Sequence, residues 1–496
     1  MQRFFHLDLN KCTGCEACVV ACANENQLPW GKSWRRVETY NEDHHPAIPL
    51  FHLSLACNHC EDAPCQKNCP ALAYSKDEFT GAVVLDPNHC MGCKYCTWAC
   101  PYDAPAFDPA AGVVEKCTFC NERQKEGHLP GCVAQCPTTA LQLGELGESG
   151  EWRPLRESAE GLSIAAGGAS RDGSAPQEEV PGFPRTAARP AIRFTPLSEG
   201  RLSPAVAPEA IDIDAILRAR RSSSRITLRS EWPLAGFTLL AACLVGWMAA
   251  RVAGPRFHWL KMHGPSVSAW TPFFFMALAV AGVGLSTLHL GRKTRAYRSI
   301  LNLRHSWLSR EIFFYSTFMA LALLSWLGFP LAGIAPWGAV VGGFAALFSM
   351  DRVYFVTKAK GLKWHSAQVI LTGLLVFGVA GSSAELAGAI LLLKLVLYLT
   401  RKSVQEDGKR AWPGWLGLLR VSGGILLPAA LWWWGGKEFS FPILLPLALG
   451  EIVDRAEFYR ELEVTSPRRQ IETDLARHLA QSYPAPAFPQ ASSSTR

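Results

Sequence analysis

The stretch CMGCKYCTWACP at residues 90–101 decides the fold of the N-terminal part of the chain. Its four cysteines follow the spacing C-x2-C-x2-C-x3-C, and CTGCEACVVAC at residues 12–22 repeats that spacing. This is the bacterial ferredoxin spacing, in which three close thiolates hold one iron–sulfur cube and the fourth cysteine binds another cube. Two further quartets lie within residues 57–69 and 117–136, so all of the 17 cysteines except Cys243 lie in this N-terminal part.

Iron–sulfur clusters explain these sixteen thiols better than zinc or disulfides do. Zinc sites favour two C-x2-C pairs about 15–20 residues apart. Disulfides belong to secreted chains, and the start MQRFFHLDLNKCTGC has neither a basic segment followed by an apolar stretch nor twin arginines. We therefore expect no signal peptide, a reducing environment and four [4Fe–4S] clusters. The expected metal ligands are Cys12, Cys15, Cys18, Cys22, Cys57, Cys60, Cys65, Cys69, Cys90, Cys93, Cys96, Cys100, Cys117, Cys120, Cys132 and Cys136.

The composition divides the chain into four parts. Hydrophobic residues make up 49% of the chain and charged residues only 18%, fewer charges than the roughly 25% of ordinary soluble domains. Residues 1–140 carry a net charge of −5, and the remainder carries +12 together with long apolar runs. A membrane surface explains that basic excess better than nucleic acid does. The parts are a cysteine domain (1–145), a linker (146–228), a membrane anchor (229–465) and a polar tail (466–496).

The linker is rich in Gly, Ala, Ser, Pro and Arg, as in SIAAGGASRDGSAPQEEVPGFPRTAARP at residues 163–190. Such a composition buries little apolar surface, so most of the linker should be an irregular tether. The less polar stretch AIRFTPL at 191–197 is a candidate for contact with a partner.

Eight apolar runs follow the linker, each near the ~20 residues that cross the hydrocarbon of a bilayer. A soluble core could hold one or two such runs but not eight. The expected fold is thus an α+β ferredoxin-like domain followed by an all-α membrane bundle of eight transmembrane helices. The runs are 232–250, 269–290, 311–329, 331–350, 366–382, 384–400, 414–434 and 439–456.

The basic residues around these runs predict the orientation of the anchor. With eight crossings, one side carries 23 Lys and Arg next to the spans and the other side carries 4. The positive-inside rule places the 23, and with them the cysteine domain, on the cytoplasmic side of a bacterial-type inner membrane. Export together with a folded partner would override this rule.

The sequence resembles the complex iron–sulfur molybdoenzymes of the dimethyl sulfoxide reductase type. Residues 1–145 are similar to their four-cluster ferredoxin subunit, and residues 229–465 to their membrane anchor. The anchor signatures stand here as EWPLAGF (231–237), STLHLGRKTRAYRS (286–299), LSREI (308–312), DRVYF (351–355) and EIVDRAEFYREL (451–462). The two parts are normally separate polypeptides, so their fusion departs from the family pattern.

The resemblance implies a crossed pairing of the cysteine quartets, which gives two pseudo-symmetric double-cubane units. It also implies that the cube of the first group faces a catalytic subunit and that the cube of the third group faces the membrane. Some relatives have a tryptophan at the second cysteine of the third group and a three-iron cluster, whereas Cys93 is present here. The implied cubes are Cys12, Cys15 and Cys18 with Cys136; Cys117, Cys120 and Cys132 with Cys22; Cys57, Cys60 and Cys65 with Cys100; and Cys90, Cys93 and Cys96 with Cys69.

The membrane part contains three candidate quinone residues. His289 has an ordinary pKa of about 6.5, which suits proton exchange, and it matches the family's proposed quinol histidine. Glu311 matches a second family position. A structural role remains open for each residue: a histidine capping a helix, and a glutamate at a helix N-terminus. Lys394 lies deep inside a span, where a structural ion pair with Glu385 or Glu451 is the alternative.

The histidines of the anchor lie at the ends of the runs or in loops, so we expect no bis-histidine haem. These residues are His258, His263, His289, His305 and His365.

We therefore expect an electron-transfer and anchor subunit that carries electrons from membrane quinol to a separate molybdopterin catalytic subunit. The family implies menaquinol and anaerobic respiration, and the chain itself has no substrate-reducing site. Three alternatives stay open. The current can run in reverse from a substrate-oxidising molybdoenzyme or a hydrogenase; the module can translocate ions; or it can be a quinone-linked ferredoxin without a catalytic subunit.

Overall fold

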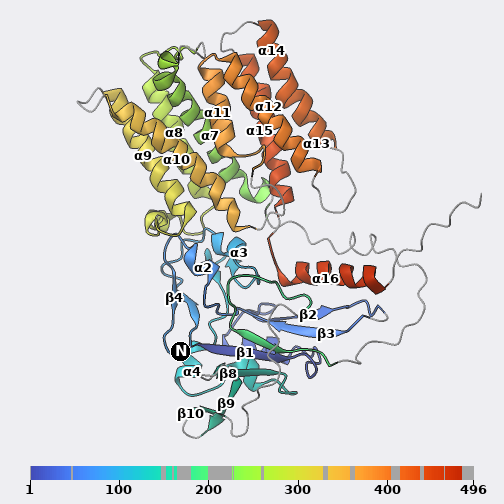
Figure 1. Cartoon of the computed structure of the whole chain (residues 1–496). Helices are drawn as coiled ribbons and strands as arrows, with labels where there is room; N and C mark the ends of the chain where they lie inside the picture. The colour runs from blue at the N-terminus through green and yellow to red at the C-terminus, as the bar shows by residue number, and fades with distance from the viewer. Residues whose placement is uncertain are drawn as a thin grey trace, which may run out of the picture.

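The computed structural model contains an iron–sulfur domain and a helical bundle stacked end to end (Figure 1). The residues that the structure describes are 2–45, 48–146, 152–158, 161–164, 180–198, 226, 228–257, 262–327, 333–357, 364–403, 414–435, 441–462 and 464–482.

The N-terminal domain is built on a five-stranded sheet with the order β10-β9-β8-β1-β11. Its central strand β1 (Arg3–Asp8) is buried at five of six positions, because neighbours cover both of its edges and the cysteine loops lie against it. It pairs antiparallel with β8 (Leu141–Leu146) and parallel with β11 (Ile192–Thr195). Strands β9 (Trp152–Ser158) and β10 (Gly161–Ile164) extend the sheet beyond β8.

Short elements carry the cysteines. Apart from α1, the helices of this domain have only four or five residues, which fits a region rich in turns. Three two-stranded hairpins join them. The helices are α1 (Ala17–Glu25), α2 (Pro64–Lys67), α3 (Tyr95–Ala99), α4 (Asn121–Lys125) and α5 (Gly131–Ala134); the hairpins pair β2 (Arg36–Tyr40) with β3 (Phe51–Leu55), β4 (Tyr74–Lys76) with β5 (Val83–Leu85), and β6 (Ala106–Asp108) with β7 (Val113–Glu115).

Part of the predicted linker belongs to this domain. The stretch 191–197, a candidate for partner contact, contains β11, which fills the edge of the chain's own sheet beside β1. Strands β9 and β10 also lie beyond residue 145. Most of the remaining linker lies outside the described residues, so its irregular character stays a prediction.

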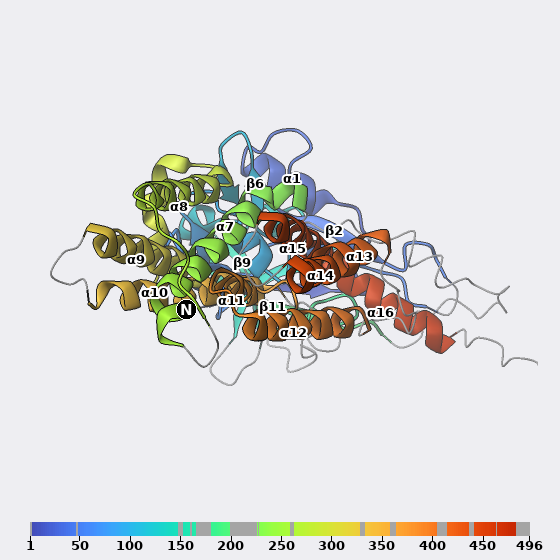
Figure 2. The ribbon, with the colours of Figure 1, turned by 90° about the horizontal axis from the view of Figure 1, so that it is seen from above.

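The C-terminal region is helical, with a helical segment at each of the eight predicted runs among the described residues. Figure 2 looks down the bundle and shows α7 between the group α8–α10 and the group α12–α15. The helices are α7 (Leu228–Ala253), α8 (Thr271–Leu288), α9 (Trp307–Leu327), α10 (Ala335–Val353), α11 (Val369–Ala380), α12 (Ala384–Ser403), α13 (Trp415–Leu418), α14 (Leu427–Gly435) and α15 (Phe441–Glu461); a π-helical segment Leu419–Leu426 joins α13 to α14.

Four of these segments are long and apolar enough to cross a membrane on length and composition. They are Leu228–Arg256, Thr271–Leu288, Ala335–Val356 and Trp415–Trp434, and Val369–Ala380 is a shorter apolar helix. Charged residues on α9, α12 and α15 lower the apolar character of the other three. The region is therefore a membrane anchor with four candidate spans, and the eight-span topology remains a prediction.

The iron–sulfur domain and the anchor share one hydrophobic core. Leu290, Leu308 and Val353 from the anchor pack in the same buried cluster as Cys90 and Cys96. After α15 the chain returns to the iron–sulfur domain as helix α16 (Pro467–Ser482), which lies beside β2 in Figure 1. The sequence predicted only a polar tail there, and residues 483–496 lie outside the described part.

Candidate functional site

The structure brings the first cysteine group together with the last cysteine of the fourth group. One cavity is lined by Cys12, Cys15, Cys18 and Cys136. Burial raises the pKa of the Cys12 thiol, and the neighbouring thiolates of the other three add to that rise. Strand β1 and its neighbour β8 bring these two ends of the domain side by side.

Cys22 lies next to cysteines of the fourth group. Burial raises the pKa of Cys117 well above its ordinary value, and the thiolates of Cys22 and Cys120 raise it further. Burial likewise raises the pKa of Cys132 to about 12, with Cys120 and Cys22 again among its neighbours. The fourth cysteine of the first group thus joins a quartet that begins almost a hundred residues later.

The second and third groups exchange cysteines in the same way. Cys60 is surrounded by Cys57, Cys65 and Cys100, whose thiolates add to the rise in pKa that burial causes. The neighbours of Cys93 include Cys69 and Cys90, and burial raises the Cys93 pKa to about 12. Cys96 also lies near Cys93 and Cys69.

The chemistry of these quartets fits iron–sulfur cubes. Among the described residues, no three His, Cys, Asp or Glu side chains converge closely enough for a single metal ion, whereas a cube takes thiolates at separate corners. Buried thiolates are costly without nearby positive charge. Arg35 and Lys116 are 2% and 3% exposed and lie among the thiolates, where both cations offset negative charge.

Backbone amides also point at the thiol sulfurs. The N–H groups of Gly92, Phe119 and Ala73 lie 3.3–3.4 Å from the Sγ atoms of Cys90, Cys117 and Cys69. Such N–H···S contacts follow from tight loops in which the chain turns around a central group, as the left-handed residues Lys94 and Cys120 do here. Hydrogen bonds to the sulfurs are one of the factors that set cluster potentials.

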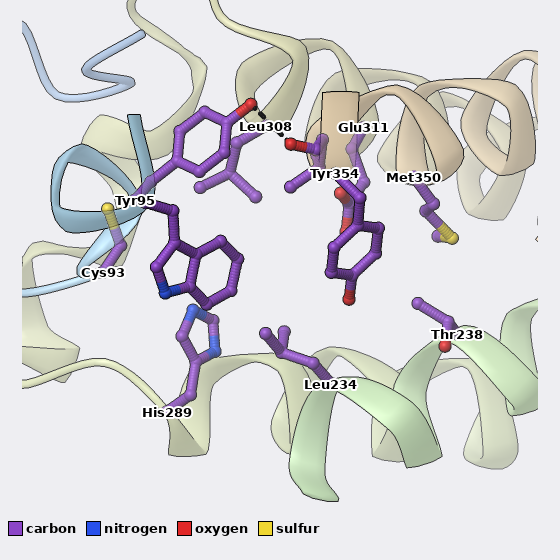
Figure 3. A pocket seen from close by; sticks show the side chains of 11 residues that line it. Cys93, Tyr95, Leu234, Thr238, His289, Leu308, Glu311, Met350 and Tyr354 are labelled. Atoms are coloured by element: carbon purple, nitrogen blue, oxygen red, sulfur yellow. Dashed lines mark hydrogen bonds between the residues drawn. The ribbon is translucent and has the colours of Figure 1, made fainter. Parts of the chain in front are cut away.

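A cavity between α3 and the anchor brings His289 and Glu311 together with a cysteine. In Figure 3, His289 and Leu234 lie on one side of this cavity and Glu311 and Tyr354 on the other. The lining residues come from α3, α7, α9 and α10 and from positions just before α3, just after α8 and just after α10. They are Cys93, Tyr95, Trp98, Leu234, Thr238, His289, Leu308, Glu311, Met350, Val353 and Tyr354.

His289 immediately follows α8 and caps its C-terminal end. Its imidazole is half-buried, and its Nδ1 atom is buried without a hydrogen-bond partner in the described structure. The imidazole lines the cavity, so its position as a helix cap does not exclude a chemical role.

Glu311 lies in the second turn of α9 and is 4% exposed. It is therefore not in the first turn of the helix, where the macrodipole would account for it. In the same cavity, the Tyr95 hydroxyl donates to the Val353 carbonyl at 3.0 Å, and the Tyr354 hydroxyl is 2.8 Å from that of Tyr459. These bonds fix both aromatic walls of the cavity.

Lys394 lies elsewhere. It is fully buried between α12 and α15, and its Nζ atom is 3.0 Å from Glu451 and 3.2 Å from Thr372. Glu385, the other predicted counter-charge, lies near Ser383 instead. Lys394 does not line the cavity that holds His289 and Glu311.

The sequence did not single out Tyr95, Trp98, Thr238 or Tyr354 as cavity residues. Tyr95 and Trp98 stand between ligand cysteines, where the spacing rule says nothing of side chains. Tyr354 belongs to the DRVYF signature, which carried no assigned role. Tyr354 could have been identified only from its proximity to the third cysteine group. That proximity arises from the fold and cannot be read from the sequence.

Comparison with known proteins divides the chain in the same way. The family model of the 4Fe-4S dicluster domain matches residues 48–146, and the model of the DMSO reductase anchor subunit matches residues 227–400. A component of the anaerobic dimethyl sulfoxide reductase of Escherichia coli is 41% identical to the chain over 155 residues. That match covers 30% of this chain and 75% of the Escherichia coli protein.

Other relatives carry different names. A thiosulfate reductase electron transfer subunit of Salmonella typhi is 42% identical over 145 residues, 29% of this chain and 75% of that protein. A sulfite dehydrogenase subunit of Allochromatium vinosum is 36% identical over 161 residues, 28% of this chain and 67% of that protein.

Proposed function

Since the chain is a member of the dimethyl sulfoxide reductase family and unites its iron–sulfur electron-transfer subunit and its membrane anchor, we propose that it carries electrons from a membrane quinol to a molybdopterin catalytic subunit. The family implies electron transfer, membrane anchoring and a catalytic partner. Four [4Fe–4S] clusters, each able to take up and pass on one electron, would be held by the sixteen cysteines in the crossed pairing.

One observation carries this proposal. The same cavity is lined by Cys93, His289 and Glu311. A residue of the membrane-facing cysteine quartet is thus next to two groups that can exchange protons. A quinol bound in this cavity would deliver electrons and protons at one place.

The side chains of the cavity can take the two protons that quinol oxidation releases along with two electrons. His289 offers an imidazole, a group that can exchange protons, from one wall of the cavity. Glu311 offers a second proton acceptor, its carboxylate, from the opposite wall. Tyr95 is already committed to the Val353 carbonyl and therefore serves as a wall rather than as a proton acceptor.

The opposite end of the cysteine domain is the proposed docking end for the catalytic subunit. Cys15, in the first cysteine group, is exposed, and Trp30, fifteen residues further along the chain, is fully exposed at 104%. An exposed tryptophan is typical of interface anchors. We place the anchor in a bacterial-type inner membrane as eight spans, with the clusters on the cytoplasmic side, on the basis of the basic loops.

Purification of the complex in mild detergent tests this proposal. We expect about sixteen irons per chain, one molybdenum or tungsten in a large co-purifying subunit, and reduction of the clusters by menaquinol. The variant Glu311→Gln should slow that reduction while the iron content stays unchanged. Iron without any large partner would refute the molybdoenzyme role, and unaltered cluster reduction in Glu311→Gln would refute the cavity as the quinol site.

The reverse current is a second candidate. The similarity to a sulfite dehydrogenase subunit favours it, because that name describes a protein of a substrate-oxidising enzyme. Electrons would then pass from the catalytic subunit to quinone at the same cavity. Measuring whether the complex reduces a quinone with an oxidisable substrate, or oxidises quinol with a reducible one, distinguishes the two. Nickel in the partner would instead point to a hydrogenase.

A further inference from the structure

The loop between α8 and α9 is hydrogen-bonded to the cysteine loop of the third group. The backbone N–H groups of Gly291 and Arg292 donate to the carbonyls of Gly92 and Met91, at 3.3 and 3.0 Å. The same loop begins next to His289, at the cavity. One segment of the anchor therefore contacts both the proposed quinol site and the nearest cysteine quartet.

Glycines allow this contact. A Cβ atom on Gly291 would collide with the Gly112 carbonyl, and one on Gly92 would collide with both Gly112 and Gly291. Gly92 also has φ +70°, which other residues rarely adopt. The backbones of the anchor loop and of Gly92 and Gly112 therefore lie too close together for a side chain at these positions.

Two side chains of this loop hold the carbonyl groups of ligand cysteines. Arg295 donates through Nη1 to the carbonyls of Cys90 and Pro87, at 2.8 and 2.6 Å. Asn302 donates through Nδ2 to the carbonyls of Cys69 and Lys67, both at 2.9 Å. Cys90 and Cys69 come from different cysteine groups, yet they belong to the same crossed quartet.

We propose that Arg295 and Asn302 are positioning residues of the membrane-facing cluster, and that Arg295 raises its reduction potential. The inference rests on the proposed function, because it needs a cluster held by Cys69, Cys90, Cys93 and Cys96. A cluster gains negative charge on reduction, and a nearby guanidinium stabilises that state. A higher potential at this position favours uptake of electrons from the cavity.

Asn302 acts on geometry rather than on charge. Asn302 hydrogen-bonds the Cys69 carbonyl to the anchor, and Arg295 does the same for the Cys90 carbonyl. Both halves of the quartet are therefore held by the same loop. Loss of either tie should disturb this quartet and leave the other three alone, because the loop makes these contacts only at residues 67, 69, 87 and 90–92 among the bonds of the described residues.

Redox titration of the full complex, followed by electron paramagnetic resonance, tests the inference. In Arg295→Gln we expect a lower potential for one cluster of four, and in Arg295→Lys a smaller shift because the charge remains. Arg298→Gln is the matched control: it removes the same charge from the same loop, where the hydrogen bond of the Arg298 side chain among the described residues goes to Tyr297 and not to a cysteine loop. In Asn302→Leu we expect an altered line shape or partial loss of the same cluster.

The outcomes separate this inference from the proposed function. Fewer than four clusters in the unmodified complex would contradict the proposed function itself. Four clusters with no shift in Arg295→Gln, or with an equal shift in Arg298→Gln, would overturn the inference alone. If Arg295→Gln loses one cluster outright while the other three keep their potentials, the positioning role is supported. The effect on the reduction potential is then measured in the Arg295→Lys variant.

Discussion

At the scale of single residues, replacing His289 is the most direct test of whether the cavity oxidises quinol. Replacing it in His289→Asn keeps a polar group there and removes the base that would take a proton from quinol. General base catalysis is worth about 10²–10⁴-fold, so the rate of cluster reduction by quinol should fall by at least about 10²-fold. Stopped-flow reduction of the clusters measures this rate.

The control for this prediction is His305→Asn, because His305 is exposed in the following loop and does not line the cavity. It should reduce its clusters at the rate of the unmodified complex. A full rate in His289→Asn, or an equal loss in both variants, would show that the imidazole takes no part.

Cys93 joins the cluster and the cavity, so its replacement tests the assignment of the third group. In Cys93→Ser one cube loses a thiolate ligand, and we expect a three-iron cluster at that position. The iron content should fall by about one per chain, with a new signal of an oxidised three-iron cluster in electron paramagnetic resonance. Cys243→Ser should change neither, since Cys243 lies in α7 outside the quartets. Unchanged iron and spectra in Cys93→Ser would contradict the proposed ligand set.

At the scale of elements, α12 and α15 are joined by a ladder of buried ion pairs. The carboxylates of Glu451, Asp454, Glu457 and Glu461 recur at helical spacing along α15. Lys and Arg side chains from α12 and from the π-helical segment form ion pairs with these carboxylates. The pairs are Lys394–Glu451 at 3.0 Å, Arg420–Glu451 at 3.0 Å, Arg420–Asp454 at 3.2 Å, Arg401–Asp454 at 2.9 Å, Arg401–Glu461 at 3.1 Å and Lys402–Glu457 at 3.0 Å.

This ladder favours a structural role for Lys394 over ion translocation. It runs from the middle of α12 to the end that faces the iron–sulfur domain. At its inner end, among the described residues, its hydrogen bonds stop at Thr372 and the Gly424 carbonyl. Translocation would need a polar path that continues to the opposite face.

Removing one member of a buried pair leaves the other charge uncompensated, which costs about 3–5 kcal/mol. We therefore expect Lys394→Met to lower the midpoint of thermal unfolding in detergent, and the double variant Lys394→Met with Glu451→Gln to recover part of the loss. Lys402→Met, at the less buried end of the ladder, should cost less. If Lys394→Met left stability intact but abolished quinol oxidation, the structural role would be wrong.

The sequence predicted the local features of the anchor well and its long-range features poorly. Hydropathy located the helices because a run of apolar residues is a local property. The run at 366–382 became the 12-residue helix α11 because Asp351 accepts the amide hydrogens of Val369 and Ile370 and so ends the loop there. Strand β11 was missed because its pairing with β1, almost two hundred residues away, leaves no periodic signal in so short a segment.

The candidate site likewise contains residues that the sequence predicted and residues that only the fold reveals. Spacing and family likeness predicted the cysteines and the two cavity residues His289 and Glu311. The contact of Arg295 with the Cys90 carbonyl could not be predicted, because it depends on the docking of two domains through glycine backbones. Lys394 was distinguished from the cavity residues only by its distance from them in the bundle.

At the scale of the whole molecule, the C-terminal helix fastens the iron–sulfur domain from the far end of the chain. In α16, the apolar residues Ile471, Leu475 and Leu479 are buried against the iron–sulfur domain. His478 lies 2.8 Å from the Tyr40 hydroxyl, and Asp474 accepts the Gly182 amide hydrogen at 2.8 Å. The chain thus passes from the clusters into the anchor and back, which holds the two parts together at both of their connections.

Removal of this helix should loosen the cluster domain and leave the anchor intact. Each buried aliphatic side chain contributes about 1.5–3 kcal/mol, so a chain ending at residue 466 should lose several kcal/mol in the stability of the iron–sulfur domain. Proteolysis should then cut within residues 36–55, where β2 and β3 lose their cover, while the anchor helices stay protected. A chain ending at residue 482 keeps α16 and is the control. Equal protease resistance in the two shortened chains would mean that α16 rests on the domain without stabilising it, and that the hydrogen bonds of the α8–α9 loop suffice to hold the clusters against the cavity.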